Sequence, residues 1–167
     1  MSRKRENVRQ CKAIRQLIDD NKYTKALELI DAIPLEEVGS LDDLYRYAEL
    51  YEKAERMDKK KEIFYHIYHR THSRYMLNRL LRLTIRMGDM EEARELYFAY
   101  EVAGPITLDT FELRYLLAKA EGEPPERLIQ ILEELKKEEY TEEWGFRLLV
   151  CMKRPGRLTN VFRNVKI

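Results

Sequence analysis

The feature that most constrains this chain is a series of short breaks that recur at a nearly fixed distance. The breaks lie at Asn21, Glu55, Gly88 and Gly122, which are 34, 33 and 34 residues apart. Between them, apolar residues recur every three or four positions, the period of an amphipathic helix. These apolar stripes fall at 14–18, 26–33, 44–51, 63–68, 77–84, 93–100, 113–120 and 128–135. Two helices per unit at a period near 34 are typical of a helical solenoid. We therefore predict an all-α fold, a right-handed α-solenoid of about four to five helix-turn-helix repeats.

The residues at the breaks suit the ends of helices. Gly88 and Gly122 can adopt the left-handed conformation that often terminates a helix. Asp89 is suited to cap the following helix, and Glu92 stands three residues later, as in a capping box. The proline pair at 124–125 lies where the first turn of a helix tolerates proline. Because the breaks are short, we expect antiparallel helical hairpins.

Two of these units share a further pattern of residues. Residues 88–93 read Gly-Asp-Met-Glu-Glu-Ala and are followed by Tyr97, Tyr100 and Pro105, while residues 21–26 read Asn-Lys-Tyr-Thr-Lys-Ala. A small or polar turn residue, then a helix with alanine and aromatic residues, resembles the second half of a tetratricopeptide repeat (TPR). The resemblance covers about residues 9–150. It implies a TPR-like helical repeat domain over residues 1–150.

The other two units depart from the pattern at the position of the small alanine. Lys60 stands there in the unit that begins at Glu55. Arg127 stands there after Gly122, with a register that is open by a residue or two. Kinship with other helical-hairpin repeat families therefore stays open.

The resemblance also implies a binding surface. In TPR proteins the first helix of each pair lines the concave face and binds an extended or helical segment of a partner. Transferring those positions implies a peptide-binding groove that contains Tyr45, Tyr75, Asn78, Arg79 and Arg82. Asn and Arg at such positions resemble a clamp for a terminal carboxylate, but only one repeat carries them, so a full clamp is not expected. Tyrosine suits such a groove because it offers a large contact area and a polar tip.

The same transfer sorts other residues. It places Cys11 and Arg15 on the groove side of the first pair. Five other tyrosines are assigned to packing between the hairpins: Tyr47, Tyr51, Tyr68, Tyr97 and Tyr100.

Charge is unevenly distributed, although the net charge is only +1. Residues 65–88 contain five arginines and no acid, with Arg79, Arg82 and Arg86 on one helical face. Residues 89–143 contain 16 acidic and 6 basic residues. This polarity is explained either by solvated faces and complementary packing between repeats, or by a basic groove that recognises an acidic peptide or a carboxylate. RNA binding is a weaker hypothesis, because the acidic segment would repel a long polyanion.

No catalytic constellation is recognisable. The chain lacks a Gly-x-Ser-x-Gly motif and a glycine-rich phosphate loop. His66, His69 and His72 are spaced by three residues, but His72 falls in a predicted turn, so we expect solvated histidines rather than a metal site. We predict a non-catalytic protein–protein interaction scaffold with no cofactor and no metal, whose partner is a protein or an acidic peptide.

Several observations bear on the compartment. Cys11 and Cys151 are far apart and no CxxC motif is present, which argues against a disulfide framework. The basic N-terminus has no apolar stretch after it and so does not match a secretory signal. No apolar run approaches the roughly 20 residues of a membrane span. We expect a soluble, cytoplasmic protein that does not contact membranes.

The end of the chain does not fit the repeats. A ninth helix is predicted from Glu142, but no acidic residue follows Trp144, and Pro155 falls where a fifth turn should begin. One hypothesis is that the atypical basic tail, residues 151–167, is read in a shifted frame, which the gene sequence would decide. The alternative is a disordered tail. Because the last repeat would lack its cap, a further alternative is the N-terminal module of a longer protein that self-associates through its C-terminal end.

Overall fold

The computed structural model describes the backbone of residues 3–137 and the side chains of residues 6–137. Within that range the chain forms eight α-helices and one short 3₁₀ helix, and no strand. The elements are α1 (Arg3–Asp19), α2 (Tyr23–Ala32), η1 (Leu35–Glu37), α3 (Leu41–Lys53), α4 (Met57–Thr71), α5 (Arg74–Met87), α6 (Met90–Val102), α7 (Leu108–Ala120) and α8 (Pro125–Lys137). The all-α prediction is confirmed for these residues. The predicted ninth helix, Cys151 and the tail 151–167 lie outside the described residues.

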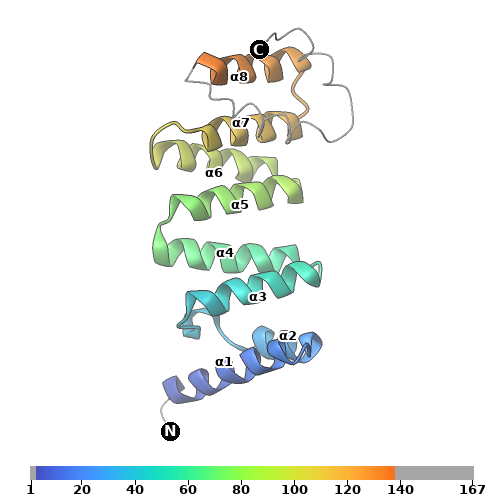
Figure 1. Cartoon of the computed structure of the whole chain (residues 1–167), viewed down its shortest axis with the longest axis vertical. Helices are drawn as coiled ribbons and strands as arrows, with labels where there is room; N and C mark the ends of the chain where they lie inside the picture. Colours follow the sequence, from blue (N-terminus) through green and yellow to red (C-terminus); the bar gives the residue numbers. More distant parts are fainter. Residues whose placement is uncertain (1–2, 138–167) are drawn as a thin grey trace. The chain divides into compact units, whose positions relative to one another are not determined.

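The chain divides into two compact units, Met1–Pro105 and Ile106–Ile167. The prediction of one repeat domain over 1–150 stays a prediction. In the first unit, α1 to α6 follow one another in chain order, and each helix packs against the next (Figure 1). The connection between α2 and α3 is longer than the others and contains η1. None of the helices in the described ranges is long and apolar enough to cross a membrane.

The four predicted breaks share one backbone geometry. Asn21, Glu55, Gly88 and Gly122 all have positive φ, between 58° and 83°. After each of them, the next amide donates to the carbonyl oxygen five residues earlier, at 2.8 to 3.3 Å. This is the bond of a Schellman motif, in which a left-handed residue ends the helix. The predicted breaks are therefore confirmed, and local backbone chemistry explains them.

The start of α6 realises only half of the predicted capping box. The Asp89 carboxylate accepts from the backbone amide of Glu92 at 3.2 Å, which caps the helix. The Glu92 carboxylate is instead bonded by two side chains of α4, the Lys61 ammonium and the Tyr65 hydroxyl, the latter at 2.5 Å. Glu92 therefore joins α6 to α4, because two charged or polar donors from α4 reach it.

The second unit shows how the last break differs from the first three. Helices α2, α4 and α6 begin two residues after the left-handed residue, but α8 begins three residues after it, at Pro125. The extra proline shifts the register by one residue. Arg127 is therefore exposed, and Leu128 takes the buried position that Ala26 and Ala93 hold in the first unit. Helices α7 and α8 pack through an apolar cluster that includes Tyr115, Leu128 and Ile131.

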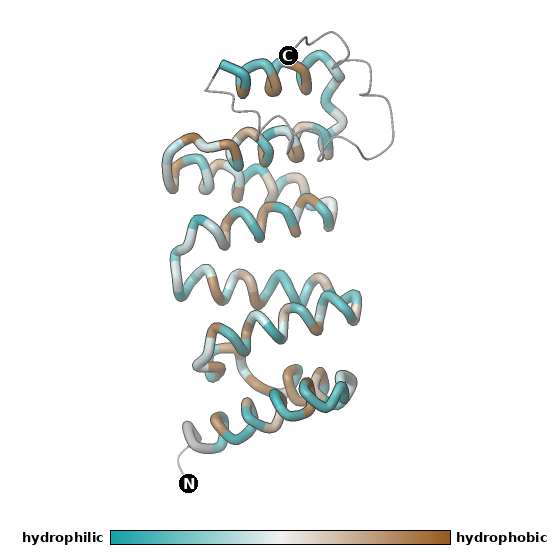
Figure 2. Tube along the Cα trace, in the orientation of Figure 1, coloured by the Kyte–Doolittle hydropathy of each residue, from teal (hydrophilic) through white to brown (hydrophobic). Residues whose placement is uncertain are grey.

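The core of the first unit is built from the predicted apolar stripes. Hydrophobic residues recur along each helix among hydrophilic ones (Figure 2). Tyr47, Tyr51 and Tyr100 are buried, as predicted, because their rings fill the space between helices. Tyr68 and Tyr97 are half-buried, so their assignment to packing is only partly realised.

Candidate functional site

The predicted groove residues lie on α3 and α5 of the first unit. Tyr75, Asn78, Arg79 and Arg82 occupy positions i, i+3, i+4 and i+7 of α5, which are on one face of a helix. Tyr45 lies on α3. The left-handed residues His72 and Gly88 precede and follow α5, and so local turns set the extent of this helix. We call Tyr45, Phe64, Tyr75 and Arg79 the arginine–aromatic cluster.

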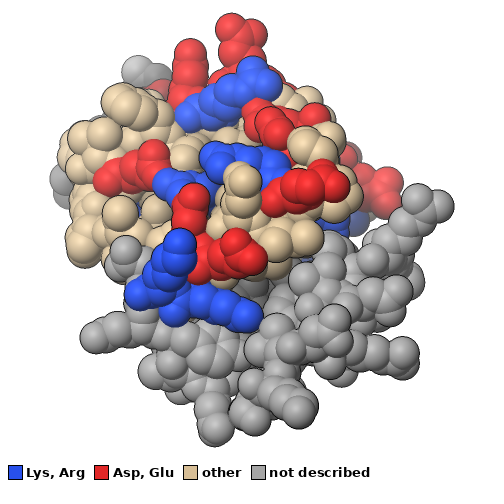
Figure 3. All heavy atoms as spheres, turned by 90° about the horizontal axis from the view of Figure 1, so that it is seen from above, with Lys and Arg blue, Asp and Glu red and all other residues tan. Residues whose placement is uncertain are grey.

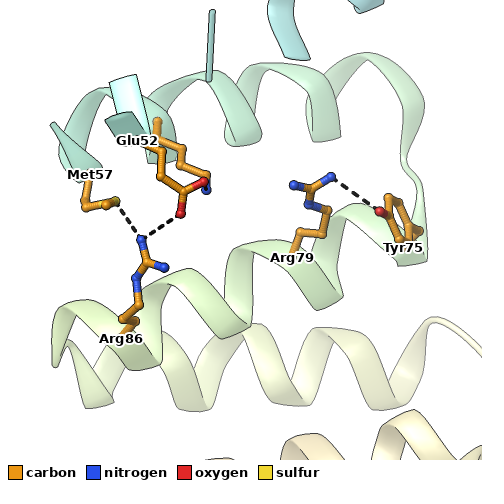
Figure 4. Close-up of polar contacts among 6 residues, drawn as sticks. Glu52, Met57, Tyr75, Arg79 and Arg86 are labelled. Atoms are coloured by element: carbon orange, nitrogen blue, oxygen red, sulfur yellow. Dashed lines mark hydrogen bonds and ion pairs between the residues drawn. The ribbon is translucent and has the colours of Figure 1, made fainter. Parts of the chain in front are cut away.

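Arg79 is the centre of this cluster. Its guanidinium carbon lies 4.9 Å from the centroid of the Phe64 ring, 5.8 Å from that of Tyr75 and 5.9 Å from that of Tyr45. One guanidinium nitrogen donates to the Tyr75 hydroxyl at 3.3 Å (Figure 4). Contact with the ring faces holds a cation by cation–π attraction without neutralising it. Three helices, α3, α4 and α5, thus supply rings that orient one positive charge.

No carboxylate of the described residues forms an ion pair or hydrogen bond with Arg79. Its contacts within the described part of the chain are the three rings and the Tyr75 hydroxyl, and none is a carboxylate. Arg79 is half-buried, and the Tyr75 side chain beside it is 62% exposed. The cluster therefore presents an oriented guanidinium at the surface, next to an exposed aromatic ring.

Asn78 and Arg82 form a second pair on the same face. Asn78 is only 8% exposed, and its side-chain oxygen accepts from the Arg82 guanidinium at 2.7 Å. Asn78 thus holds Arg82 in position rather than offering a surface of its own. Sequence reasoning identified Tyr45, Tyr75 and Arg79 of the arginine–aromatic cluster but missed Phe64. That residue was recognisable only as part of an apolar stripe.

A second arginine on α5 has a different environment. Arg86 points from α5 toward the preceding hairpin of α3 and α4, as Arg79 does (Figure 4). Arg86 donates to the Glu52 carboxylate at 3.0 Å and also contacts the Met57 sulfur at 2.9 Å. The other oxygen of Glu52 accepts from Lys60 at 2.6 Å. These bonds, with that of Lys60 first, hold the pKa of Glu52 below its ordinary value.

The contact with Glu52 also explains why Lys60 stands in place of the small alanine. The Lys60 side chain is 9% exposed, and its ammonium lies 5.3 Å from the centroid of the Phe64 ring. The Lys60 side chain is therefore largely buried between the helices, and its ammonium meets a carboxylate whose side chain is itself 39% exposed. Lys60 thus departs from the repeat pattern and forms an ion pair between α4 and α3.

The groove-side residues of α1 surround a small hollow. Arg15 donates two hydrogen bonds to Asp43 at the start of α3, at 2.6 and 2.7 Å. The hollow beside this pair has a volume of about 120 Å³ and is also lined by Cys11, Val8 and Ser40. That volume is well below the several hundred Å³ of a small-molecule pocket. Arg15, unlike Arg79, is already paired with an acid.

Charges of both signs are mixed on the surface. On the face drawn in Figure 3, acidic and basic side chains lie next to one another among uncharged residues. The pair formed by Lys61 and Glu92 and the pair formed by Arg86 and Glu52 each join helices of different hairpins. Part of the charge polarity along the sequence is therefore used in packing between neighbouring hairpins.

Two of the three histidines pack against tyrosine rings. His72 has φ of 48° in the turn after α4, as predicted, and its ring packs against Tyr68. His69 packs against Tyr65 and Tyr68.

No known family model, curated protein or solved structure matches this chain. The resemblance to TPR proteins therefore stays a prediction.

Proposed function

We propose that this protein is a non-catalytic interaction scaffold that binds an acidic segment of a partner protein at the arginine–aromatic cluster. In this proposal the paired helices form a right-handed solenoid of TPR-like repeats, and α1, α3 and α5 line its concave face. A partner carboxylate pairs with the Arg79 guanidinium. An apolar or aromatic side chain of the partner packs against Tyr75.

The observation that carries the proposal is the environment of Arg79. Three rings hold the Arg79 guanidinium in place, its hydrogen bond to the Tyr75 hydroxyl lies at the exposed surface, and no carboxylate of the described chain bonds it, so a partner carboxylate could pair with it there. Arg15, Arg56, Arg86 and Arg114 each pair with a carboxylate. Arginine and tyrosine are also the residues that contribute most often to binding energy at protein interfaces.

The test uses synthetic peptides, because the natural partner is not identified. The first probe is a blocked peptide of about twelve residues, made of Gly, Ser and Tyr with one central Glu, and the second has Gln in place of Glu. Binding is followed by NMR titration of the ¹⁵N-labelled protein, including the Arg79 side-chain Nε–H signal. We expect the Glu peptide to bind about tenfold more tightly than the Gln peptide, since a hydrogen bond to a charged group contributes about 1.5 kcal/mol.

Two variants locate the site. Arg79→Gln is expected to remove the preference for Glu over Gln. The control Lys25→Gln removes the same charge from an exposed position on α2 and should leave the preference unchanged. Equal binding of both peptides by the wild-type protein would refute the proposal.

Two further measurements test the alternatives. Sedimentation at several concentrations tests self-association, which would show as a concentration-dependent mass. An RNA oligonucleotide that bound more tightly than the Glu peptide, with affinity falling steeply as salt rises, would favour the nucleic-acid alternative.

A further inference from the structure

Arg79 and Arg86 lie on the same face of α5 but differ in one respect. Both side chains point from α5 toward the preceding hairpin, formed by α3 and α4 (Figure 4). Arg79 has rings around it and no carboxylate within the described chain, whereas Arg86 is bonded to Glu52. The surface therefore contains one guanidinium that lacks an acid and one that already has an acid from the chain itself.

The spacing of the two arginines matches a short extended peptide. Seven residues of α-helix separate them, which corresponds to about 10.5 Å along the axis. An extended chain covers that distance in about three residues. A partner segment with acids at positions i and i+3 would therefore place the first at Arg79 and the second beside Arg86.

Glu52 is well placed to oppose that second acid. Its carboxylate is fixed from both sides, because Lys60 holds one oxygen and Arg86 holds the other. The Glu52 side chain is 39% exposed and the Arg86 side chain 55%, so an incoming acid would meet both. It would have to compete with Glu52 for the guanidinium and would lie close to a like charge.

We propose that Glu52 is a specificity-determining residue that occupies Arg86 in place of a partner carboxylate, so that a second acid in the partner segment adds little affinity to that of the first acid at Arg79. The inference rests on the proposed function, because it takes Arg79 as the primary contact. Because Glu52 already occupies Arg86, a partner segment with two acids three residues apart gains little affinity from its second acid.

The experiment compares the one-Glu peptide described above with a peptide that has two Glu residues three positions apart. In the wild-type protein the two-Glu peptide should bind no more than about twofold better, the statistical gain from having two carboxylates that can reach Arg79. In Glu52→Gln, where Arg86 is released, the two-Glu peptide should bind at least about fivefold better than the one-Glu peptide at low salt. If the ratio of the affinities of the two-Glu and one-Glu peptides were the same in both proteins, the inference would be overturned.

Glu52→Gln also leaves the buried Lys60 ammonium without its carboxylate, so its fold needs a control. The double variant Glu52→Gln with Lys60→Met removes both charges and should show the same gain for the two-Glu peptide. Lys60→Met alone keeps Glu52 on Arg86 and should behave as the wild-type protein does. If Lys60→Met alone produced the gain, the selectivity would depend on Lys60, and the assignment to Glu52 would be wrong.

Failure of the inference can be told apart from failure of the proposed function. Arg79→Gln in the Glu52→Gln background should remove most of the affinity for both peptides. If Arg79→Gln has no effect in either background, the proposed function is wrong. If Arg79→Gln weakens binding but Glu52→Gln leaves the ratio of the two peptides unchanged, only the role of Glu52 is wrong.

Discussion

The ion pair between Lys60 and Glu52 leads to a prediction in which the two partners differ in their effect on stability. The Lys60 side chain is 9% exposed, whereas that of Glu52 is 39% exposed. Glu52→Gln therefore leaves a buried ammonium with only a neutral acceptor. Losing a charge-assisted hydrogen bond to a buried group costs about 2 kcal/mol. Lys60→Met keeps an unbranched stem of similar length against Phe64 and leaves Glu52 paired with Arg86, so we expect a change within about 1 kcal/mol.

The assay is urea unfolding followed by circular dichroism. For a unit of the size of Met1–Pro105 the dependence on urea is about 1.5 kcal/mol per M, so Glu52→Gln should lower the midpoint by about 1.3 M. The double variant Glu52→Gln with Lys60→Met should recover most of that loss, because no buried charge remains. If Lys60→Met alone lowered the midpoint as much as Glu52→Gln does, the pair itself would be strongly stabilising. That result would contradict the expectation that the cost of burying the Lys60 ammonium offsets most of the gain from its ion pair.

Three further predictions concern the backbone, the core and pH. Gly88→Ala should lower the free energy of unfolding by about 1 kcal/mol, because φ at this residue is +83°. Glu55→Gly, where φ is 59°, should leave the stability unchanged or raise it, and a lower urea midpoint for this variant would contradict the prediction. Thr84→Val should raise the free energy of unfolding by about 1 kcal/mol, because the buried Thr84 hydroxyl has no hydrogen-bond partner among the described residues; a clear loss of stability would contradict this explanation. The hydrogen bond from Arg56 lowers the pKa of Asp31 in the folded state. The stability that this bond contributes is complete above about pH 4, which is the pKa of an unfolded aspartate. It is lost as the pH falls through the lower pKa of the folded state. In urea titrations, the free energy of unfolding should therefore fall less for Asp31→Asn than for the wild-type protein as the pH is lowered from about 4 to 2. An equally steep fall in both proteins would count against a stabilising bond between Arg56 and Asp31.

Much of the fold could be predicted because it depends on residues close together in sequence. The apolar stripes correspond to α1 to α8, and the four breaks correspond to four left-handed residues. Helical periodicity and the Schellman motif involve positions within about six residues of one another, so a sequence pattern is sufficient to locate them. The start of α8 was left open because two consecutive prolines allow more than one register, and only the packing of Leu128 resolves it.

The candidate site was only partly predictable. The spacing of Tyr75, Arg79 and Arg82 on one helix face follows from sequence, since these residues lie within two turns. The environment of Arg79 does not follow from it, because Phe64 and Tyr45 come from other helices. Asn78 was assigned to the groove surface, yet α5 buries it beside Arg82.

The sequence by itself determined that the described part of the chain is helical and where four of its helices end, since those properties arise from the chemistry of neighbouring residues. Only the tertiary structure decided which charges are paired. Arg86 meets Glu52 across 34 residues, about one repeat period, while Arg79 on the same face meets rings instead of an acid. That difference depends on how α3, α4 and α5 pack, and periodicity carries no information about side-chain distances between helices. The proposed lack of gain from a second acid in the partner arises from that packing.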